Sequence, residues 1–328
     1  MIKETIIANS KDRNIRKTSS SGGAFTELIK AWFDKDGKCV VYGCKMNKNL
    51  DAVHYRATSI VECEPMRGSK YIGSNVIGIN NKVLDDLKLG YKVLFSGTPC
   101  QCASLKKYLA KNQVEYGDNL LLIDFVCHGV GDNGFFKDYV RYLEKKYKSK
   151  AVKVNFRAKS KPGRKQDMEI SFENGKKYNA SSTKYDWFYS IYLKNLILKP
   201  SCYSCKFTSI ERESDITLAD YWNSKTTEEA KSLILVSTEK GKKMVEDVKD
   251  NMVMETTDLS RVRQPHLYKP CDKPSGYDMF WEIYKKDGYA AVQKYMGNNT
   301  LKGKVKDRLV YIAMKLNLIY TAKKIMKK

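Results

Sequence analysis

Two neighbouring stretches decide the fold: residues 91–111, YKVLFSGTPCQCASLKKYLAK, and residues 119–129, NLLLIDFVCHG. Each begins with an apolar run of strand length and passes into a polar loop that contains glycine. A helical pattern follows the first loop, before the second strand begins. Strand, loop, helix and strand in this order are typical of a parallel α/β unit.

The same alternation continues outward along the chain. Helical and apolar strand patterns follow one another at residues 27–34, 39–44, 81–89, 135–147, 187–198 and 232–238. From residue 151 the pattern changes to short alternating segments separated by turn residues, which indicates antiparallel strands. We therefore expect an α/β fold, with a parallel or mixed sheet flanked by helices, an antiparallel strand insertion and a helical C-terminal tail.

Composition limits the class of protein. The chain has 328 residues, a net charge of +23 and a mean hydropathy of −0.53. Its longest apolar runs are far shorter than the roughly 20 residues of a membrane span, and its N-terminus is polar, so a cytoplasmic location is expected. The charge is mostly a lysine-rich surface without a nucleic-acid-binding motif, so we expect no specific nucleic-acid partner. It suits an anionic cofactor, an acidic protein or a membrane surface.

The nine cysteines are an odd number with uneven spacing, which argues against a disulfide framework. Two of them, Cys100 and Cys127, follow neighbouring strands, and the carboxyl ends of such strands meet at one edge of the sheet. A third motif, Cys202-x-x-Cys205, supplies two more thiolates at a spacing suited to a metal or cluster. Four thiolates can hold zinc or a [4Fe–4S] cluster, and the spacing does not separate these two alternatives.

A further motif, TSSSGG at residues 18–23, lies directly ahead of a predicted helix. Hydroxyls and glycines at a helix N-terminus leave backbone N–H groups free to bind an anion. An ordinary helix N-cap is the competing interpretation.

Six ordered blocks within residues 13–245 resemble the beta-subunit family of coenzyme F-420 hydrogenases and dehydrogenases. They are SSSGGAFTELIKAWFDKDGKCVVYGC, RGSKYIGSNVI, VLFSGTPCQCASLKKYL, LIDFVCHGV, PSCYSCKFTSIERESDITLADYW and SLILVSTEKG. The resemblance implies a flavoprotein that binds FAD and an iron–sulfur cluster and passes electrons between the cluster and a hydride acceptor or donor. Many bacterial relatives stand among glycan-biosynthesis enzymes.

The resemblance also implies the site residues. Cluster ligands would be Cys100, Cys127, Cys202 and Cys205, and the FAD site would include Ser19, Ser20, Ser21, Gly22, Gly23, Ser69, Lys70, Tyr71, Ser96, Gly97, Thr98 and Pro99. The cation of Lys70 would stabilise the reduced flavin, which makes it a catalytic candidate. His128 is the second, as a hydrogen-bond partner of the flavin or a proton relay, with a structural histidine as the alternative.

This sequence has no ferredoxin-like cysteine run ahead of the flavin region, so we expect a separate ferredoxin-like electron partner and a hydride substrate that the sequence leaves unidentified. Coenzyme F-420 is the hydride partner that the family name suggests, although the composition is typical of AT-rich bacteria, which often lack it. A metal- or cluster-bearing electron-transfer or scaffold subunit without turnover is the alternative function.

By motif, the chain divides into residues 1–80 (flavin-binding part), 81–255 (part with the cluster cysteines) and 256–328 (basic helical tail). Residues 301–328 combine an apolar helical face with many lysines. They predict either a helix docked on the protein or peripheral contact with an anionic membrane, at its inner face.

Overall fold

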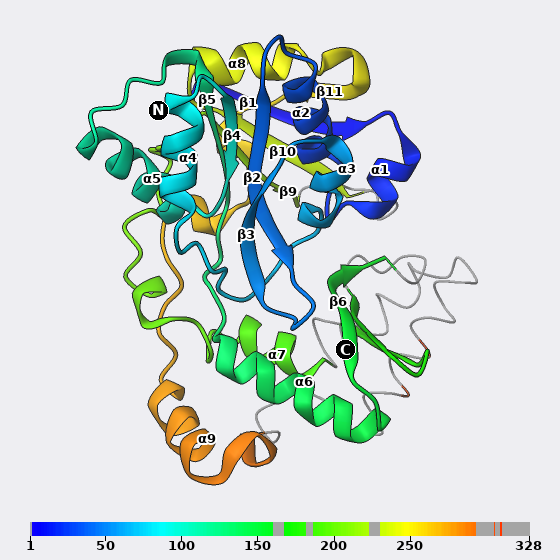
Figure 1. Ribbon diagram of the computed structural model, residues 1–328. Coiled ribbons are helices and arrows are strands. Elements are labelled where there is room, and N and C mark those ends of the chain that lie inside the picture. Colours follow the sequence, from blue (N-terminus) through cyan, green and yellow to red (C-terminus); the bar gives the residue numbers. More distant parts are fainter. Residues whose placement is uncertain are drawn as a thin grey trace. The chain divides into compact units, whose positions relative to one another are not determined.

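Figure 1 shows the computed structural model, which describes residues 2–159, 167–181, 186–222 and 230–292, together with residues 305 and 309. The chain forms two compact units. Unit 1 comprises Met1–Asn133 and Leu198–Asp272, and unit 2 comprises Gly134–Ile197 and Lys273–Lys328. The predicted divisions at residues 80 and 255 follow motifs rather than packing, and they stay a prediction.

Unit 1 is built on an eight-stranded mixed sheet with the order β11-β1-β10-β9-β5-β4-β2-β3. Its strands are β1 (Glu4–Ser10), β2 (Cys39–Met46), β3 (Ala52–Ala57), β4 (Lys92–Ser96), β5 (Leu120–Phe125), β9 (Ile216–Tyr221), β10 (Lys231–Val236) and β11 (Met252–Thr256). β2, β4, β5 and β9 are parallel neighbours, whereas the pairs at both ends of the sheet are antiparallel. The expectation of a parallel or mixed sheet is therefore confirmed.

Helices cover both faces of this sheet (Figure 1). On one face, α2 (Ala24–Phe33) and α8 (Glu239–Glu246) share a core with alternate strand residues such as Val41. On the other face, α4 (Ile79–Lys88) and α5 (Pro99–Lys111) pack against the remaining strand residues, which alternate with the first set along each strand, such as Val40 and Tyr42. Successive side chains of a strand point to opposite faces, so near-continuous apolar runs are what a sheet covered on both sides requires. Shorter elements are α1 (Arg13–Thr18), α3 (Ile60–Cys63), η1 (Glu64–Met66), η2 (Gly117–Asn119), η3 (Pro200–Cys202), η4 (Lys249–Asn251), η5 (Leu259–Arg261) and η6 (Pro265–Leu267).

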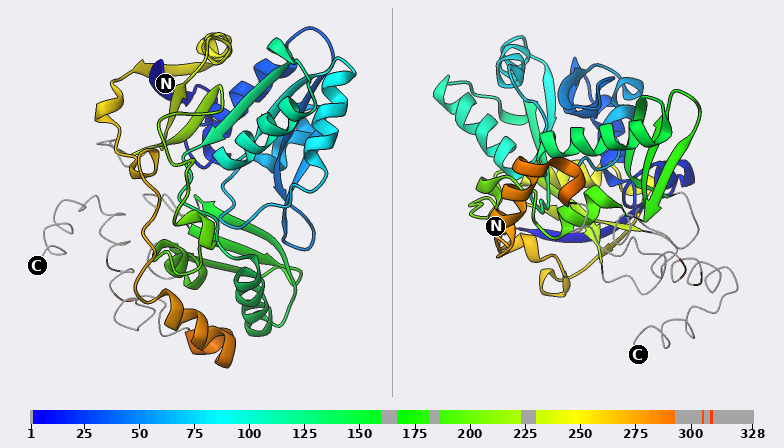
Figure 2. Two further views of the ribbon diagram at one scale, coloured as in Figure 1. Left: turned by 90° about the vertical axis from the view of Figure 1, so that its left-hand side faces the viewer. Right: turned by 90° about the horizontal axis from the view of Figure 1, so that it is seen from below.

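Unit 2 contains the predicted antiparallel insertion, which is confirmed. Its sheet has three strands in the order β6-β7-β8, and these residues are coloured green in Figure 2. Its elements are β6 (Ala151–Ala158), β7 (Asp167–Phe172), β8 (Lys177–Ser181), α6 (Asn133–Tyr147), α7 (Trp187–Leu193) and α9 (Tyr277–Ala291). The core is aromatic: the ring of Phe136 lies 5.1 Å from that of Phe188 and 5.3 Å from that of Phe156, and Phe135 reaches Phe280 of α9 at 5.7 Å.

The chain leaves unit 1 after Asn133 and re-enters it at Leu198. These two points are close together, because Gly131 and Leu198 form an antiparallel bridge and the N–H of Lys199 donates to the carbonyl of Val130 at 2.8 Å. The excursion through residues 134–197 therefore starts and ends at one place on the sheet edge.

Several sequence predictions differ from the structure in detail. The helix expected at 187–198 ends at Leu193, because Asn195 adopts a left-handed φ of 60° that ends the helical path. The expected tail helix lies outside the described residues except for Val305 and Leu309, which are helical and exposed. Within the described part of the chain, no helix has the length and apolar character that crossing a membrane needs.

Candidate cofactor and metal sites

The predicted site residues collect at the carboxyl edge of the parallel strands in unit 1. β4 ends at Ser96, and Cys100 lies in the first turn of the α5 helix that follows. β5 is paired with β4 in parallel and ends at Phe125, two residues before Cys127. This is the edge at which ligands of open α/β sheets bind.

The Cys202-x-x-Cys205 segment runs beside the loop that follows β5. The N–H of Val130 donates to Sγ of Cys202 at 3.4 Å. Burial raises the pKa of Cys127 to about 12, and repulsion from the thiolates of Cys100, Cys202 and Cys205 adds to the rise. The four predicted ligands therefore share one electrostatic environment although they come from three separate segments.

The spacing of these four sulfur atoms bears on the choice between zinc and a cluster. A tetrahedral zinc ion with bonds of about 2.3 Å brings its sulfur ligands to about 3.8 Å from one another. All four cysteines are described, and no three of their sulfur atoms lie within 4.8 Å of one another. This arrangement by itself leaves both zinc and a cluster open as occupants.

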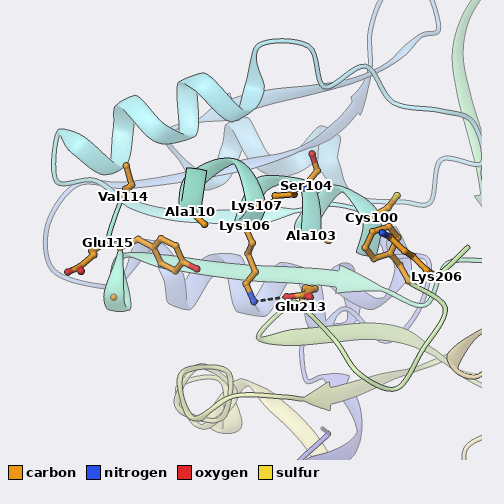
Figure 3. A pocket seen from close by; sticks show the side chains of 13 residues that line it. Cys100, Ala103, Ser104, Lys106, Lys107, Ala110, Val114, Glu115, Lys206 and Glu213 are labelled. Atoms are coloured by element: carbon orange, nitrogen blue, oxygen red, sulfur yellow. Dashed lines mark hydrogen bonds and ion pairs between the residues drawn. The ribbon is translucent and has the colours of Figure 1, made fainter. Parts of the chain in front are cut away.

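Cys100 is exposed and borders an open groove of about 990 Å³ (Figure 3). Lys106, Lys107 and Lys206 also line this groove, and the Lys106 ammonium forms an ion pair with Glu213 at 2.7 Å. The predicted cluster position is thus accessible from a surface that carries several lysines.

The two predicted flavin segments contact each other. Oγ of Ser20 accepts hydrogen bonds from the N–H of Ser69 at 2.9 Å and from its hydroxyl at 3.1 Å. The next residue, Ser21, donates its hydroxyl to the carbonyl of Lys231 on β10 at 2.6 Å. The structure therefore brings together the Ser19–Gly23 loop and the Ser69–Tyr71 block, which are about 50 positions apart in the sequence.

Packing on the sheet explains the glycine pair of this loop. A Cβ on Gly22 would lie 2.4 Å from the carbonyl oxygen of Ala8 and 2.7 Å from the nitrogen of Ser232, both backbone atoms. Gly23 has a φ of +96°, where a side chain is strained. The absence of a side chain at Gly22 therefore allows the loop to pack directly against the backbone of β1 and β10.

The segment of residues 69–75 connects the predicted flavin loop with the predicted cluster loop. Its Tyr71 carbonyl accepts the N–H of Gly131 at 3.1 Å, four residues beyond Cys127. Ser74 accepts a hydrogen bond from the side chain of Gln101 on α5 at 2.9 Å. We call residues 69–75 the strap.

Lys70, the first catalytic candidate, lies in this strap with its ammonium held by three carbonyls. Nζ donates to the carbonyls of Pro65, Met66 and Arg67 at 3.2, 2.8 and 3.1 Å. Burial lowers its pKa to about 8. The side chain therefore caps the end of η1 as well as placing a cation beside the strap.

The loop of residues 96–99 uses its backbone amides within the protein. The N–H of Gly97 donates to the carbonyl of Ile123 at 3.1 Å, and that of Thr98 donates to Oε1 of Gln101 at 2.9 Å. Pro99 has no N–H. The Thr98 hydroxyl lies 3.1 Å from Sγ of Cys100, a predicted cluster ligand, so this loop contacts the predicted cluster position directly.

His54, on β3, is a residue of this edge that the sequence did not single out. Its Nε2 lies 3.0 Å from the carbonyl of Ser96, and its ring stacks on Phe95 with centroids 5.6 Å apart. Burial lowers its pKa to about 4, so it is neutral at pH 7. In the sequence AVHYRA, His54 occupies a position that alternates with more exposed residues, and this pattern could have predicted that it is buried.

His128, the second catalytic candidate, contacts two residues that the sequence did not connect with it. Nδ1 of His128 lies 3.0 Å from Nε2 of His266. Sγ of Cys271 lies 3.8 Å from both of these nitrogens. No spacing signal could have shown this group, since His266 and Cys271 lie 138 and 143 positions after His128 in the sequence.

The sheet with helices on both faces, and four cysteines at the carboxyl edge of its parallel strands, define an α/β protein with a candidate redox centre. Residues 90–262, more than half of the chain, match the family that is described as the C terminus of the coenzyme F420 hydrogenase/dehydrogenase beta subunit. The chain belongs to this family, which is named for subunits of oxidoreductases, and this supports a redox role.

The fold agrees with this assignment. A chain of the F420-reducing [NiFe] hydrogenase complex from Methanosarcina barkeri, studied by xenon derivatization, matches with a TM-score of 0.53 and 17% identity. The match covers 90% of this chain and 91% of that chain, so the likeness of fold extends over nearly all of both. Comparison with curated proteins gives no match.

Proposed function

We propose that the chain is an FAD- and [4Fe–4S]-dependent oxidoreductase that passes electrons between the cluster and a hydride acceptor or donor. One observation supports this most: the strap contacts both the Ser19–Gly23 loop, through Ser69, and the loop after Cys127, through Tyr71. A flavin and a cluster held by these segments would be neighbours. The family assignment agrees with this pairing of cofactors.

The cluster would be held by Cys100, Cys127, Cys202 and Cys205. The donor set suits it, because four thiolates are the usual ligands of a [4Fe–4S] cluster. The family assignment favours a cluster over zinc.

FAD would be held by the Ser19–Gly23 loop, the strap and residues 96–99. The guanidinium of Arg67 lies 3.4 Å from the hydroxyl of Thr18, so it adjoins this loop and would balance part of the charge of the cofactor's phosphates. Lys70 would stabilise the reduced flavin ring. When bound, the flavin joins one-electron transfer at the cluster to two-electron hydride transfer. The hydroxyls of Ser20, Ser96 and Thr98 would orient it by hydrogen bonding.

Electrons would be exchanged with a separate, ferredoxin-like protein. The groove beside Cys100 supports this, because it exposes a predicted cluster ligand next to Lys107 and Lys206. Glu115 also lines the groove and Glu213 pairs with Lys106, so its excess of positive charge rests on these two lysines. An acidic protein would be attracted to such a surface. Coenzyme F-420 is the hydride partner that the family description offers for testing. The proposal also includes peripheral contact with an anionic membrane, beside enzymes of glycan biosynthesis.

The cofactor content tests the proposal. The protein purified without oxygen should show the two flavin absorption bands over a broad iron–sulfur shoulder that dithionite bleaches. Cys202→Ser and Cys205→Ser should each lower the content of iron and acid-labile sulfide. Cys39→Ser and Cys63→Ser, which change thiols away from the four, should leave both contents unchanged.

Two results would contradict it. A colourless protein with zinc on the four cysteines would overturn the assignment of both cofactors. A flavin-free protein with an intact cluster would instead favour an electron-transfer subunit without turnover.

A further inference from the structure

The group formed by His128, His266 and Cys271 stands apart from the four cysteines and has the composition of a metal site. One donor atom from each of these three side chains lies within 4.8 Å of the other two. Two segments far apart in the chain supply the group. His128 comes from the loop after β5, and the other two come from the segment that follows β11.

The three donor atoms are close enough to one another to share a single ion. Zinc bonds of about 2.05 Å to nitrogen and about 2.3 Å to sulfur place two nitrogens about 3.3 Å apart and a sulfur about 3.6 Å from each nitrogen. The nitrogens of His128 and His266 lie 3.0 Å apart, and Sγ of Cys271 lies 3.8 Å from each. Sγ of Cys271 also lies 3.8 Å from Nε2 of His128 and 3.9 Å from Nδ1 of His266, so the donor atoms are within reach of one ion, but both imidazoles have to turn to point a nitrogen at it.

The surroundings also suit a bound ion. Cys271 is buried, with 4% of its surface exposed, whereas both histidines are half-buried, so the three ligands are positioned by packed structure. The neighbouring Leu267 is fully buried against Leu233 and Leu235 of β10, which fixes the segment on the sheet. Gln264 donates its side-chain amide to the carbonyl of Asp220 on β9 at 2.5 Å.

We propose that His128, His266 and Cys271 bind one zinc ion, separate from the cluster and with a fourth position open to water. Two imidazoles and one thiolate are a ligand set that zinc accepts in tetrahedral geometry. The ion would join the loop after β5 to the segment of residues 264–271. His128 would then be a metal ligand rather than a proton relay.

A hydrogen-bonded group without metal is the alternative. The thiol of Cys271 donates to the carbonyl of His128 at 3.0 Å, and the two imidazoles are within hydrogen-bond distance of each other. A metal-free group of this kind would persist in the presence of a chelator, whereas a zinc site would not.

Metal analysis of the full chain decides between them. The protein should be purified without oxygen, equilibrated with zinc chloride, desalted, and analysed for zinc and iron together. The wild type should retain about one zinc per chain. His266→Gln and Cys271→Ser should lose it and keep their iron, whereas the controls Cys39→Ser and Cys63→Ser should keep both metals.

A second measurement needs no variant to fold. Cobalt(II) added to zinc-free wild-type protein that retains its iron should produce, in the difference spectrum, the absorption of a tetrahedral cobalt–thiolate centre, and added zinc should abolish that absorption. Absence of zinc and of the cobalt signal in the wild type would overturn the proposal. Loss of iron in the His266→Gln variant would overturn it too, because the group would then belong to the cluster. Zinc retained in a protein without iron would instead leave this site standing and contradict the proposed function.

Discussion

Asp124 and Arg212 form an ion pair in the interior of unit 1, with Oδ2 of the carboxylate 3.7 Å from Nη1 of the guanidinium and both side chains almost completely buried. Asp124 lies on β5, three residues ahead of Cys127, and Arg212 lies seven residues after Cys205. The pair therefore joins the two segments that supply three of the four candidate ligands. Burial raises the pKa of Asp124 to about 6, and the guanidinium opposes this rise.

Arg212→Met should destabilise the protein by about 3–5 kcal/mol at pH 7.5, because it leaves a buried carboxylate without its partner. The double variant Asp124→Leu/Arg212→Met should recover much of this loss, since neither charge remains. Urea unfolding of the three proteins measures the difference. A single variant as stable as the wild type would show that the pair contributes nothing.

Asp186 should make unit 2 less stable as the pH rises. Its carboxylate accepts hydrogen bonds from the hydroxyls of Tyr139 and Tyr178 and from the N–H of Tyr189, yet burial raises its pKa from 3.8 to about 6. Between these two values the folded state binds more protons than the unfolded state, so stability falls as the pH rises from about 4 to about 7.

The variant Asp186→Asn isolates this contribution. Relative to the wild type, it should gain on the order of 2 kcal/mol between pH 4 and pH 7, because its side chain does not titrate. Urea unfolding at several pH values, followed by tyrosine and tryptophan fluorescence, gives the comparison. Parallel pH profiles for the two proteins would contradict the prediction.

Gly22→Ala should destabilise unit 1 by about 1–3 kcal/mol, because the new methyl group would meet backbone atoms of β1 and β10 that have no room to move. Gly276→Ala is the matched control, since a Cβ at Gly276 meets no atom within 4 Å and its φ is −83°. Thermal unfolding measures both. Equal melting temperatures for the two variants would show that the loop can shift away from the sheet.

Lys70→Met should reduce the amount of flavin that co-purifies with the protein and also lower its melting temperature. The first effect follows from loss of the cation and the second from loss of the donor to the carbonyls of Pro65, Met66 and Arg67. Lys70→Arg should retain more flavin than Lys70→Met, and Lys48→Met, at an exposed position, should behave as the wild type. Unchanged flavin content in Lys70→Met would leave the lysine with its structural role alone.

Charge reversal in the groove should slow reduction by an acidic electron donor. Lys107 and Lys206 are exposed and line the groove beside Cys100, so Lys107→Glu and Lys206→Glu should lower the rate and weaken its dependence on salt. Lys48→Glu serves as the control. Stopped-flow reduction by a plant-type or bacterial ferredoxin measures the rate, and identical salt profiles in all four proteins would exclude the groove as the docking surface.

Local patterns were sufficient to predict the class of fold. The apolar runs at β2, β4, β5 and β10 are long and lie next to helical patterns, so their assignment needed no tertiary information. β1, β3, β9 and β11 were not predicted. β11, MVMET, is short and largely exposed at the sheet edge, so pairing with β1 rather than its own pattern makes it a strand.

The candidate site could be predicted only in part. Position after a strand placed Cys100 and Cys127 at one edge, the C-x-x-C spacing added Cys202 and Cys205, and resemblance to a family implied the iron–sulfur cluster. The contact between His128 and Cys271 depends on where the chain returns after β11, and no local pattern carries that information. The hydrogen bonds that hold Lys70 depend likewise on the turn that η1 makes.

The bridge between Gly131 and Leu198 changes the entropy of assembling the cysteine set. Along the chain, Cys127 and Cys202 are about 75 residues apart, but once the bridge has formed only four residues separate each cysteine from it. The loop to be closed then shrinks to about eight residues, roughly three halvings, and each halving lowers the closure cost by about 0.6 kcal/mol. Folding of the excursion through residues 134–197 therefore makes it easier to bring the two halves of the ligand set together by about 2 kcal/mol.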